Sequence, residues 1–266
     1  MRVPIDEVLT QLKQVGYYVA NVPTDGEEPV QVVLAIARSL GDLFVPADCD
    51  PTAPVIRTAP ARRQWAAPFD RPEQIGWHGD FSTYEDRPEL SLVYITRPDP
   101  QGGDYGAWRL ASVPRVLAAL TATDEGRAAF DLLSQERVPF SYSEDEEPRW
   151  FRVIETGDDG GFGLRFYLPS IHRGCVAHYG EVPPHIGEAL VALGNAADEV
   201  GETVPTRAGS LLIASNWLAL HDRVRQTISR TRPNREALLC FVAHPHVGGF
   251  RGSDHHREEE SSVTVG

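Results

Sequence analysis

The pattern of apolar and polar residues predicts two helices and one strand in the first part of the chain. Apolar side chains recur at the helical spacing over Ile5–Val15, and Gly16 ends this segment. A strand is expected over Tyr17–Val22, and a second helix over Glu28–Leu40. These helices precede most of the predicted strands, where they can flank a sheet.

The rest of the chain is predicted to be rich in strands. Runs of β-branched, aromatic and other apolar residues are typical of strands buried in a sheet. Such runs occur at Val55–Thr58, Leu90–Thr96, Trp150–Ile154, Phe162–Tyr167, Ala208–Ala214 and Arg235–Ala243. Helical periodicity returns at Val113–Gln135 and Pro183–Val200.

Strands and helices do not alternate regularly, which argues against a doubly wound parallel sheet. The pattern favours a mainly β (α+β) fold, a double-stranded β-helix or jelly roll with flanking and inserted helices. We expect residues 1–247 to form one such domain. The polar and charged tail, residues 248–266, has no periodicity and is expected to be disordered.

Composition narrows the classes of partner. The formal net charge of −13 argues against nucleic acid or an anionic membrane as the main partner. No apolar run approaches the roughly 20 residues of a membrane span, and the polar start is unlike a secretory signal. The three scattered cysteines form neither a disulfide framework nor a thiolate metal cluster. A reducing cytoplasm is therefore the expected location.

The segment Gly76–Phe81 carries the first candidate chemistry. In an extended segment every second side chain projects to the same face, so His78 and Asp80 would project together, while Gly79 leaves room between them. One imidazole and one carboxylate are two of the three ligands of the facial triad of non-haem Fe(II) oxygenases. The third ligand would be a histidine farther along the chain.

Among nine histidines, His221 is the strongest candidate for this third ligand. It follows a buried strand, has Asn216 and Arg223 near it, and precedes another strand that begins at Arg235. A histidine packed in the core without a metal is the alternative interpretation. The pair His255–His256 lies in the predicted tail, where any metal affinity would be adventitious.

These residues together resemble a family, the Fe(II)/2-oxoglutarate-dependent oxygenases, in the branch of taurine dioxygenase and clavaminate synthase. The resemblance covers roughly residues 15–245, in order and spacing as well as identity. Its motifs are Trp77–Asp80, Gly102–Asp104, Asn216–Arg223 and Arg235. It implies that His78, Asp80 and His221 hold Fe(II), that Arg235 pairs with a carboxylate of 2-oxoglutarate, and that O2 is the second co-substrate.

Two positions depart from the family pattern. Relatives often place a threonine after the Gly-Gly-Asp/Glu turn to help hold 2-oxoglutarate, and Tyr105 stands there. Its longer-reaching hydroxyl could bind the co-substrate, or the position could have lost this role. Some relatives carry a second arginine four residues after the first, and Leu239 stands there. Because Asp80 supplies a carboxylate, the chain does not resemble the halogenases of the family.

The resemblance implies an oxygenase that hydroxylates a C–H bond of a small, soluble molecule of the natural-product or amino-acid type. Desaturation, epoxidation or cyclisation are alternative outcomes. A metal-dependent jelly-roll isomerase or hydrolase without 2-oxoglutarate, or an inactive small-molecule binder, are alternative classes. Arg62, Arg63 and Arg165 are candidates to meet a substrate carboxylate or phosphate. The oligomeric state is left open.

Overall fold

The larger of two facing β-sheets forms one wall of the domain. The computed structural model describes residues 3–46, 49–50, 52–58, 71–143 and 145–246. This sheet is antiparallel, with strand order β1, β11, β4, β13 and β2, while β3 pairs with the first part of β13. Its strands are β1 (Tyr17–Asn21), β2 (Gly41–Phe44), β3 (Ile56–Thr58), β4 (Leu90–Arg97), β11 (Ser210–Ser215) and β13 (Glu236–Pro245).

A smaller antiparallel sheet faces the first. Its order is β10 (Glu202–Val204), β5 (Trp108–Ser112) and β12 (Ala219–Arg223). Between the two sheets lies a cluster of buried apolar residues contributed by both. Its members are Ile95, Leu212, Ala214 and Ala237 from the larger sheet, and Trp108, Leu110 and Ala219 from the smaller. The two layers form the predicted jelly-roll arrangement.

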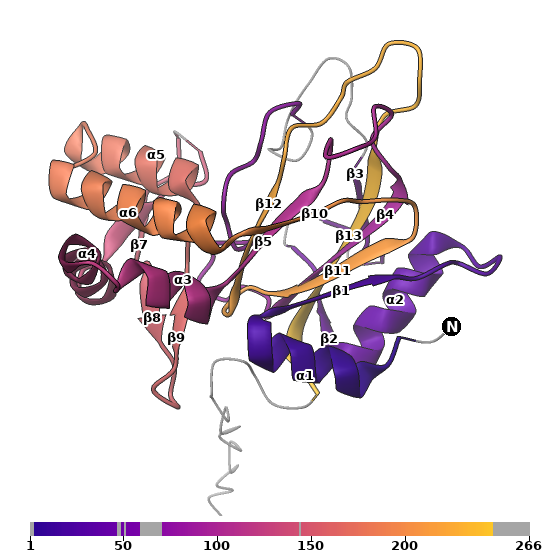
Figure 1. Cartoon of the computed structure of the whole chain (residues 1–266), viewed down its shortest axis with the longest axis horizontal. Coiled ribbons are helices and arrows are strands. Elements are labelled where there is room, and N and C mark those ends of the chain that lie inside the picture. The colour runs from indigo at the N-terminus through magenta and orange to yellow at the C-terminus, as the bar shows by residue number, and fades with distance from the viewer. Residues whose placement is uncertain (1–2, 47–48, 51, 59–70, 144, 247–266) are drawn as a thin grey trace, which may run out of the picture.

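Two N-terminal helices cover the outer face of the larger sheet (Figure 1). Helix α1 (Ile5–Val15) has the predicted bounds, and α2 (Pro29–Leu40) starts one residue after the predicted start. Buried residues of both helices, such as Leu12 and Val33, pack with Leu92 of β4 and Ile213 of β11. The apolar face of each helix thus packs against the larger sheet and buries its outer face.

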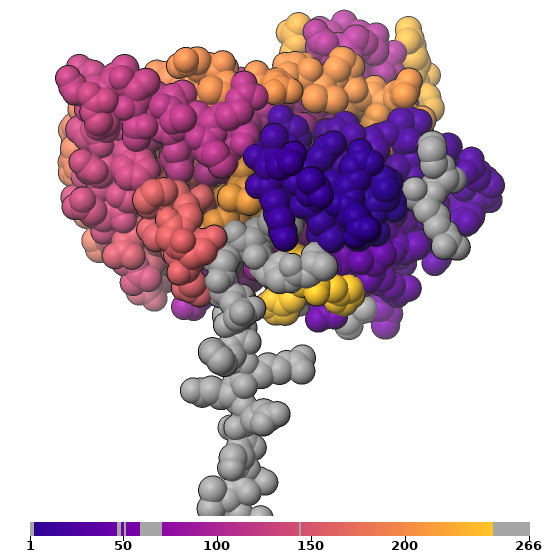
Figure 2. Space-filling model, turned by 60° about the horizontal axis from the view of Figure 1, so that its bottom comes forward, coloured from indigo at the N-terminus to yellow at the C-terminus, as the bar shows by residue number. Residues whose placement is uncertain are grey.

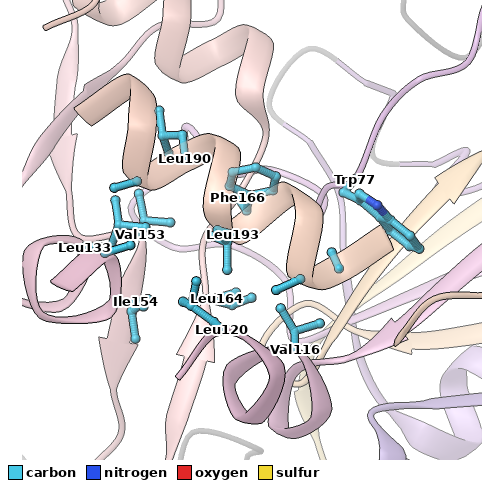
Figure 3. Packing of buried hydrophobic residues seen from close by; sticks show 14 of the residues in the cluster. Trp77, Val116, Leu120, Leu133, Val153, Ile154, Leu164, Phe166, Leu190 and Leu193 are labelled. Atoms are coloured by element: carbon cyan, nitrogen blue, oxygen red, sulfur yellow. The ribbon is translucent and has the colours of Figure 1, made fainter. Parts of the chain in front are cut away.

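A helical insertion covers the outer face of the smaller sheet. It consists of α3 (Val113–Leu120), α4 (Asp124–Gln135), α5 (Leu168–Tyr179), α6 (Pro184–Val200) and the hairpins β6 (Val138–Phe140) with β7 (Arg149–Phe151) and β8 (Ile154–Thr156) with β9 (Phe162–Leu164). Figure 3 shows the core of this insertion, with Trp77 at one end of α6. Leu220 points into this core, while the next residue, His221, faces the other sheet.

The insertion corrects two predictions. The single helix expected over Val113–Gln135 is two helices, because the Thr123 hydroxyl accepts a hydrogen bond from Gly126 N (3.0 Å) and starts a new helix. Helix α5 was not predicted, since it exposes Leu168 and Val176 and its apolar periodicity is weak. The strand predicted over Phe162–Tyr167 is present as the shorter β9, which pairs with β8, whereas most of the strand predicted over Trp150–Ile154 belongs to β7, which pairs with β6.

The segment that carries His78 is not a regular strand. Only His78 itself forms β-bridges, to Tyr167 and to His221. In Figure 2 the indigo N-terminal segment and the magenta to salmon insertion lie on the same face of the molecule. Within the described residues, no helix is both long and apolar enough to cross a membrane. The predicted tail lies outside the described residues.

Candidate metal centre

His78, Asp80 and His221 come together between the two sheets. One potential ligand atom from each lies within 4.8 Å of the others. The Nε2 atom of His78 is 3.6 Å from Asp80 Oδ1, and Nε2 of His221 is 3.4 Å from Asp80 Oδ2. The carboxylate therefore faces both imidazoles, which is the arrangement expected of a 2-His-1-carboxylate site.

The backbone sets the spacing of the two imidazoles. His78 N donates to His221 O (3.0 Å), and His221 N donates to His78 O (2.9 Å). Residues that exchange both hydrogen bonds in an antiparallel pair project their side chains to the same face. The two ring centroids are accordingly 4.3 Å apart. This pairing across 143 residues is what brings the distal histidine to the first motif (221 − 78 = 143).

Asn216 fixes the third member of the triad. Its Oδ1 accepts a hydrogen bond from Asp80 N (2.9 Å), and its Nδ2 donates to Pro88 O (3.0 Å) and Ser91 Oγ (2.9 Å). Asn216 is 1% exposed, so its rotamer is fixed by these three contacts. Immediately after Asp80, Phe81 adopts a left-handed conformation (φ 56°), which is uncommon for a residue other than glycine.

The electrostatics of the site favour a divalent cation. Burial and the neighbouring imidazole of His221 lower the pKa of His78 to about 4, so His78 is neutral at pH 7. Burial opposes ionisation of Asp80, but His221, His78 and a hydrogen bond with Ser91 outweigh it and lower the pKa of Asp80. The neutral His78 imidazole and the ionised Asp80 carboxylate can thus bind a metal without losing a proton.

Each imidazole has its Nε2 atom turned to the carboxylate. His78 Nδ1 lies 2.8 Å from Gly76 O, an interaction that fixes the ring and leaves Nε2 for a metal. Nδ1 of His221 is buried and has no hydrogen-bond partner in the described residues. The donor set and the geometry therefore fit Fe(II) with two histidines and one aspartate.

Asp222 ties the His78 segment to strand β12 from the opposite side of the sheet. Its carboxylate accepts hydrogen bonds from Gly76 N (2.8 Å), from Gln74 Nε2 and from an Arg109 terminal nitrogen (3.3 Å). The Asp222 side chain is 0% exposed. Because Asp222 follows His221 and Gly76 is two residues before His78, this carboxylate holds both halves of the site in register.

Arg109 connects this carboxylate to the insertion. Its guanidinium lies 4.4 Å from the Trp77 ring and also pairs with Asp198 of α6. Trp77 Nε1 donates to the same Asp198 carboxylate (2.8 Å). The buried indole beside His78 is therefore fixed by packing, a cation–π contact and a hydrogen bond.

Arg235 lies in the interior beside Arg223 and Asp99. It is 5% exposed, and burial together with Arg223 lowers its pKa to about 9, while Asp99 opposes this shift. Its Nε atom is buried without a hydrogen-bond partner in the described residues. A Cβ at Gly106 (φ 70°) would lie 2.8 Å from Arg235 Cδ, so only glycine leaves room for this side chain. A buried guanidinium with an unpaired N–H fits an anionic ligand such as 2-oxoglutarate.

Other predicted site residues lie elsewhere. The Tyr105 ring lies 4.8 Å from the Arg225 guanidinium, in a surface cavity of about 540 Å³ that both residues line. Gly106, the next residue, lies against the Arg235 side chain. A role for Tyr105 in holding the co-substrate stays a prediction. Arg62 and Arg63 lie outside the described residues.

Arg165 is held by structural contacts. Its Nε donates to Glu155 Oε1 (2.7 Å) and one terminal nitrogen donates to Ser82 O (3.2 Å) and Tyr84 O. Arg87 binds the other oxygen of Glu155 (2.7 Å). These contacts favour a role for Arg165 in fixing the loop after Asp80, rather than direct contact with substrate.

Several residues of the site were missed by sequence reasoning. They are Ser91, Arg109, Tyr167, Asp198 and Asp222, and each acts across elements far apart in the chain. The one local signal was the position of Asp222 directly after His221, where strand alternation turns a carboxylate toward the opposite face.

Comparison with known proteins identifies the family of the chain. The family model for taurine catabolism dioxygenase TauD, TfdA family, matches residues 21–240. The chain belongs to this family of dioxygenases. The resemblance to Fe(II)/2-oxoglutarate-dependent oxygenases of the taurine dioxygenase branch is thereby confirmed. No curated protein matches the chain.

Solved structures share the fold at low identity. Asparagine oxygenase in complex with Fe(II), 3-hydroxyasparagine and succinate is 21% identical, with a TM-score of 0.71 over 88% of this chain and 77% of that one. PvcB from Pseudomonas aeruginosa is 17% identical (TM-score 0.66, 91% and 80%). The non-haem iron oxygenase OrfP with Fe and α-ketoglutaric acid is 16% identical (TM-score 0.65, 90% and 78%). The predicted jelly-roll fold is confirmed.

Proposed function

We propose that the chain hydroxylates an unactivated C–H bond of a small molecule of the amino-acid or natural-product type, with Fe(II) held by His78, Asp80 and His221. The observation that carries this proposal is the convergence of these three side chains within 4.8 Å, between the sheets of a TauD-family fold. Bound there with 2-oxoglutarate and O2, Fe(II) would supply the oxidising power, and the products would be hydroxylated substrate, succinate and CO2.

Arg235 is proposed to anchor 2-oxoglutarate. Arg235 is buried beside Arg223, which acts on it electrostatically. Arg223 stands two residues after His221 on the same face of β12, so the Arg235 guanidinium lies near the triad. A planar guanidinium suits a carboxylate bidentately. A buried cation of this kind is not needed by a metal-dependent isomerase or hydrolase without 2-oxoglutarate, and therefore disfavours that class.

The protein's own contribution is positioning and exclusion of water. Asn216 and Asp222 fix the triad from two sides, and Leu110 of the apolar cluster between the sheets pairs with His221. Such fixed ligands reduce the reorganisation needed during reaction. An amino-acid type of substrate is supported by the neighbours: asparagine oxygenase was solved with a hydroxyasparagine and OrfP with a hydroxyarginine, each together with succinate.

The test is metal and co-substrate binding by the purified protein. Anaerobic Fe(II) plus 2-oxoglutarate should give the weak visible charge-transfer band of the chelated complex. His221→Ala and Asp80→Ala should lower iron content and abolish 2-oxoglutarate consumption. Their circular dichroism spectra should match that of the wild type, which shows that the fold is retained. His185→Ala, at an exposed histidine on α6, is the matched control. Full iron content and activity in His221→Ala would refute the triad.

The outcome of the reaction is read from the product. In a substrate screen that reports succinate above the uncoupled background, hydroxylation adds one oxygen atom to the substrate mass. Desaturation removes two hydrogen atoms instead, so mass spectrometry distinguishes the proposed hydroxylation from this alternative. Epoxidation of an alkene also adds one oxygen atom, and it is identified by loss of the alkene signals in NMR.

A further inference from the structure

The inward face of the larger sheet is partly open at its centre. Leu239 of β13 and Val93 of β4 lie directly opposite one another, and Val93 packs against the cluster between the sheets, so both side chains face the smaller sheet. Both are nevertheless partly exposed. Buried residues of the same two strands that face α1 and α2 are at most 2% exposed, namely Leu90, Leu92, Tyr94, Leu238, Cys240 and Val242. The space between the sheets is therefore accessible at this point.

Aromatic side chains continue this open stretch toward β2. Phe241 follows Leu239 on the same face of β13, and it pairs with Phe44 of β2. The ring of Phe81 lies against both, with its centroid 4.8 Å from that of Phe241 and 5.1 Å from that of Phe44. Phe44 and Phe81 are partly exposed, whereas Phe241 is buried. We call Phe44, Phe81 and Phe241 the aromatic wall.

The aromatic wall begins beside the metal ligand Asp80. Phe81 is the next residue in the chain, and Phe241 pairs with Ser91 of β4. Ser91 Oγ accepts a hydrogen bond from Asn216 Nδ2 (2.9 Å), and Asn216 Oδ1 accepts one from Asp80 N (2.9 Å). Both ends of the wall thus connect to Asp80, one through the chain and the other through hydrogen bonds. The wall is continuous with the metal centre.

The loop after the metal ligand fixes the Phe81 ring. Tyr84 N donates to Phe81 O (2.9 Å), which closes a turn, and the two rings are in edge contact with centroids 5.1 Å apart. Arg149 donates to Thr83 O (3.3 Å) in the same turn. An apolar surface that is fixed before a ligand arrives costs little conformational entropy on binding. The wall is therefore suited to hold an apolar group.

The aromatic wall and Arg235 lie in different directions from the metal centre. Arg235 directly precedes β13, so Leu239 lies between it and Phe241 along the strand. Phe44 lies instead across the strands, on β2. A co-substrate that runs from the metal to Arg235 therefore leaves the side of Phe44 and Phe81 for a second molecule.

We propose that the aromatic wall is the subsite for the side chain of the organic substrate. This inference rests on the proposed function and names the substrate class, an amino acid with a large apolar or aromatic side chain. Edge-to-face contacts with aromatic rings add to the gain from burying apolar surface. Leu239, where some relatives carry an arginine, adds no charge to this stretch. Hydroxyasparagine and hydroxyarginine, seen in two of the similar structures, carry polar side chains, so the inference separates this chain from them.

The experiment titrates the anaerobic Fe(II)–2-oxoglutarate complex with amino acids and follows its charge-transfer band. The apolar probes are L-leucine, L-methionine, L-phenylalanine, L-tyrosine and L-tryptophan. The comparison probes are L-alanine, L-asparagine and L-arginine, which share the same backbone groups. At least one apolar probe should perturb the band and bind about tenfold or more tightly than every comparison probe.

Two variants test whether the wall is responsible. Phe81→Asn removes a ring at a left-handed position that asparagine adopts more readily, so the backbone is not strained further. Phe44→Leu keeps an apolar side chain but removes the ring. Phe81→Asn should weaken the best apolar probe by about tenfold, and Phe44→Leu by about threefold. Phe162→Asn is the matched control, because it removes an exposed ring on β9, and it should bind the probe as the wild type does.

The affinity for 2-oxoglutarate is measured for each variant and should change less than the affinity for the probe. The inference is overturned if no apolar probe perturbs the band, if a comparison probe binds as tightly, or if Phe81→Asn weakens the probe no more than Phe162→Asn. An equal loss of 2-oxoglutarate affinity would place the wall in the co-substrate site and also overturn it. In each case the band of the wild type still supports the proposed function. Absence of that band would overturn both.

Discussion

Asp222→Asn tests whether the carboxylate behind the sheet positions the metal ligands. The asparagine oxygen can still accept from Gly76 N, but its amide group presents N–H donors to Gln74 or Arg109, which are donors themselves. Hydrogen bonds to a buried charged group are worth about 1.5–3 kcal/mol each. With two of three contacts impaired, we expect the free energy of unfolding to fall by about 3 kcal/mol, or about 6–12 °C in Tm for a chain of this size.

The second effect of this substitution separates positioning from simple stabilisation. Residues that orient metal ligands typically change metal affinity by about ten- to a hundredfold. Fe(II) affinity of Asp222→Asn, measured by anaerobic titration well below the Tm of the variant, should fall within that range. Asp131→Asn, at an exposed position on α4, should change neither property. If Asp222→Asn lost stability but kept wild-type iron affinity, the carboxylate would hold the fold and not the site.

Two further predictions concern arginines. Arg235→Ala should weaken 2-oxoglutarate binding by about ten- to a hundredfold, and Arg235→Lys by less, because lysine keeps the charge but not the fork. The Fe(II) affinity of both variants should be unchanged. If Arg232→Ala, at an exposed arginine, lost more 2-oxoglutarate affinity than Arg235→Ala, Arg235 would not be the residue that anchors 2-oxoglutarate. Arg165→Gln should lower Tm by removing a contact to Glu155, without raising the substrate KM selectively. A higher substrate KM at unchanged Tm would instead indicate that Arg165 contacts the substrate.

The sequence by itself determined the local elements and the ligand types. Periodicity predicted α1 with its observed bounds, because α1 packs through one apolar stripe. It failed for α5, where Gly174 lies so close to β6 that a Cβ would be 2.2 Å from Pro139 O. Among its apolar side chains that helix buries Ile171 and Cys175, while Leu168 and Val176 are exposed and Gly174 approaches the backbone of β6, so the periodic signal is weak.

The motif residues were also predicted from the sequence. His78, Asp80 and His221 were named on residue type and spacing, and the structure brings all three together. Strand alternation was the wrong local reason, since the His78 segment forms only isolated bridges. What turns Asp80 toward both imidazoles is the hydrogen bond from its backbone to Asn216, a contact across 136 residues.

Only the tertiary structure decided which charged residues serve the site. Arg165 and Arg235 are the same residue type in the sequence, yet Arg165 is paired with the Glu155 carboxylate, whereas Nε of the buried Arg235 has no hydrogen-bond partner in the described residues. Whether a charged residue forms an ion pair, binds a ligand or repels another charge depends on the groups within a few ångströms of it. The reason is that electrostatic and hydrogen-bond energies fall steeply with distance and with exposure to water. Those distances are set by strand pairing and by the packing of the insertion. Both depend on residues far apart in the chain, so they cannot be read from any one residue of the sequence.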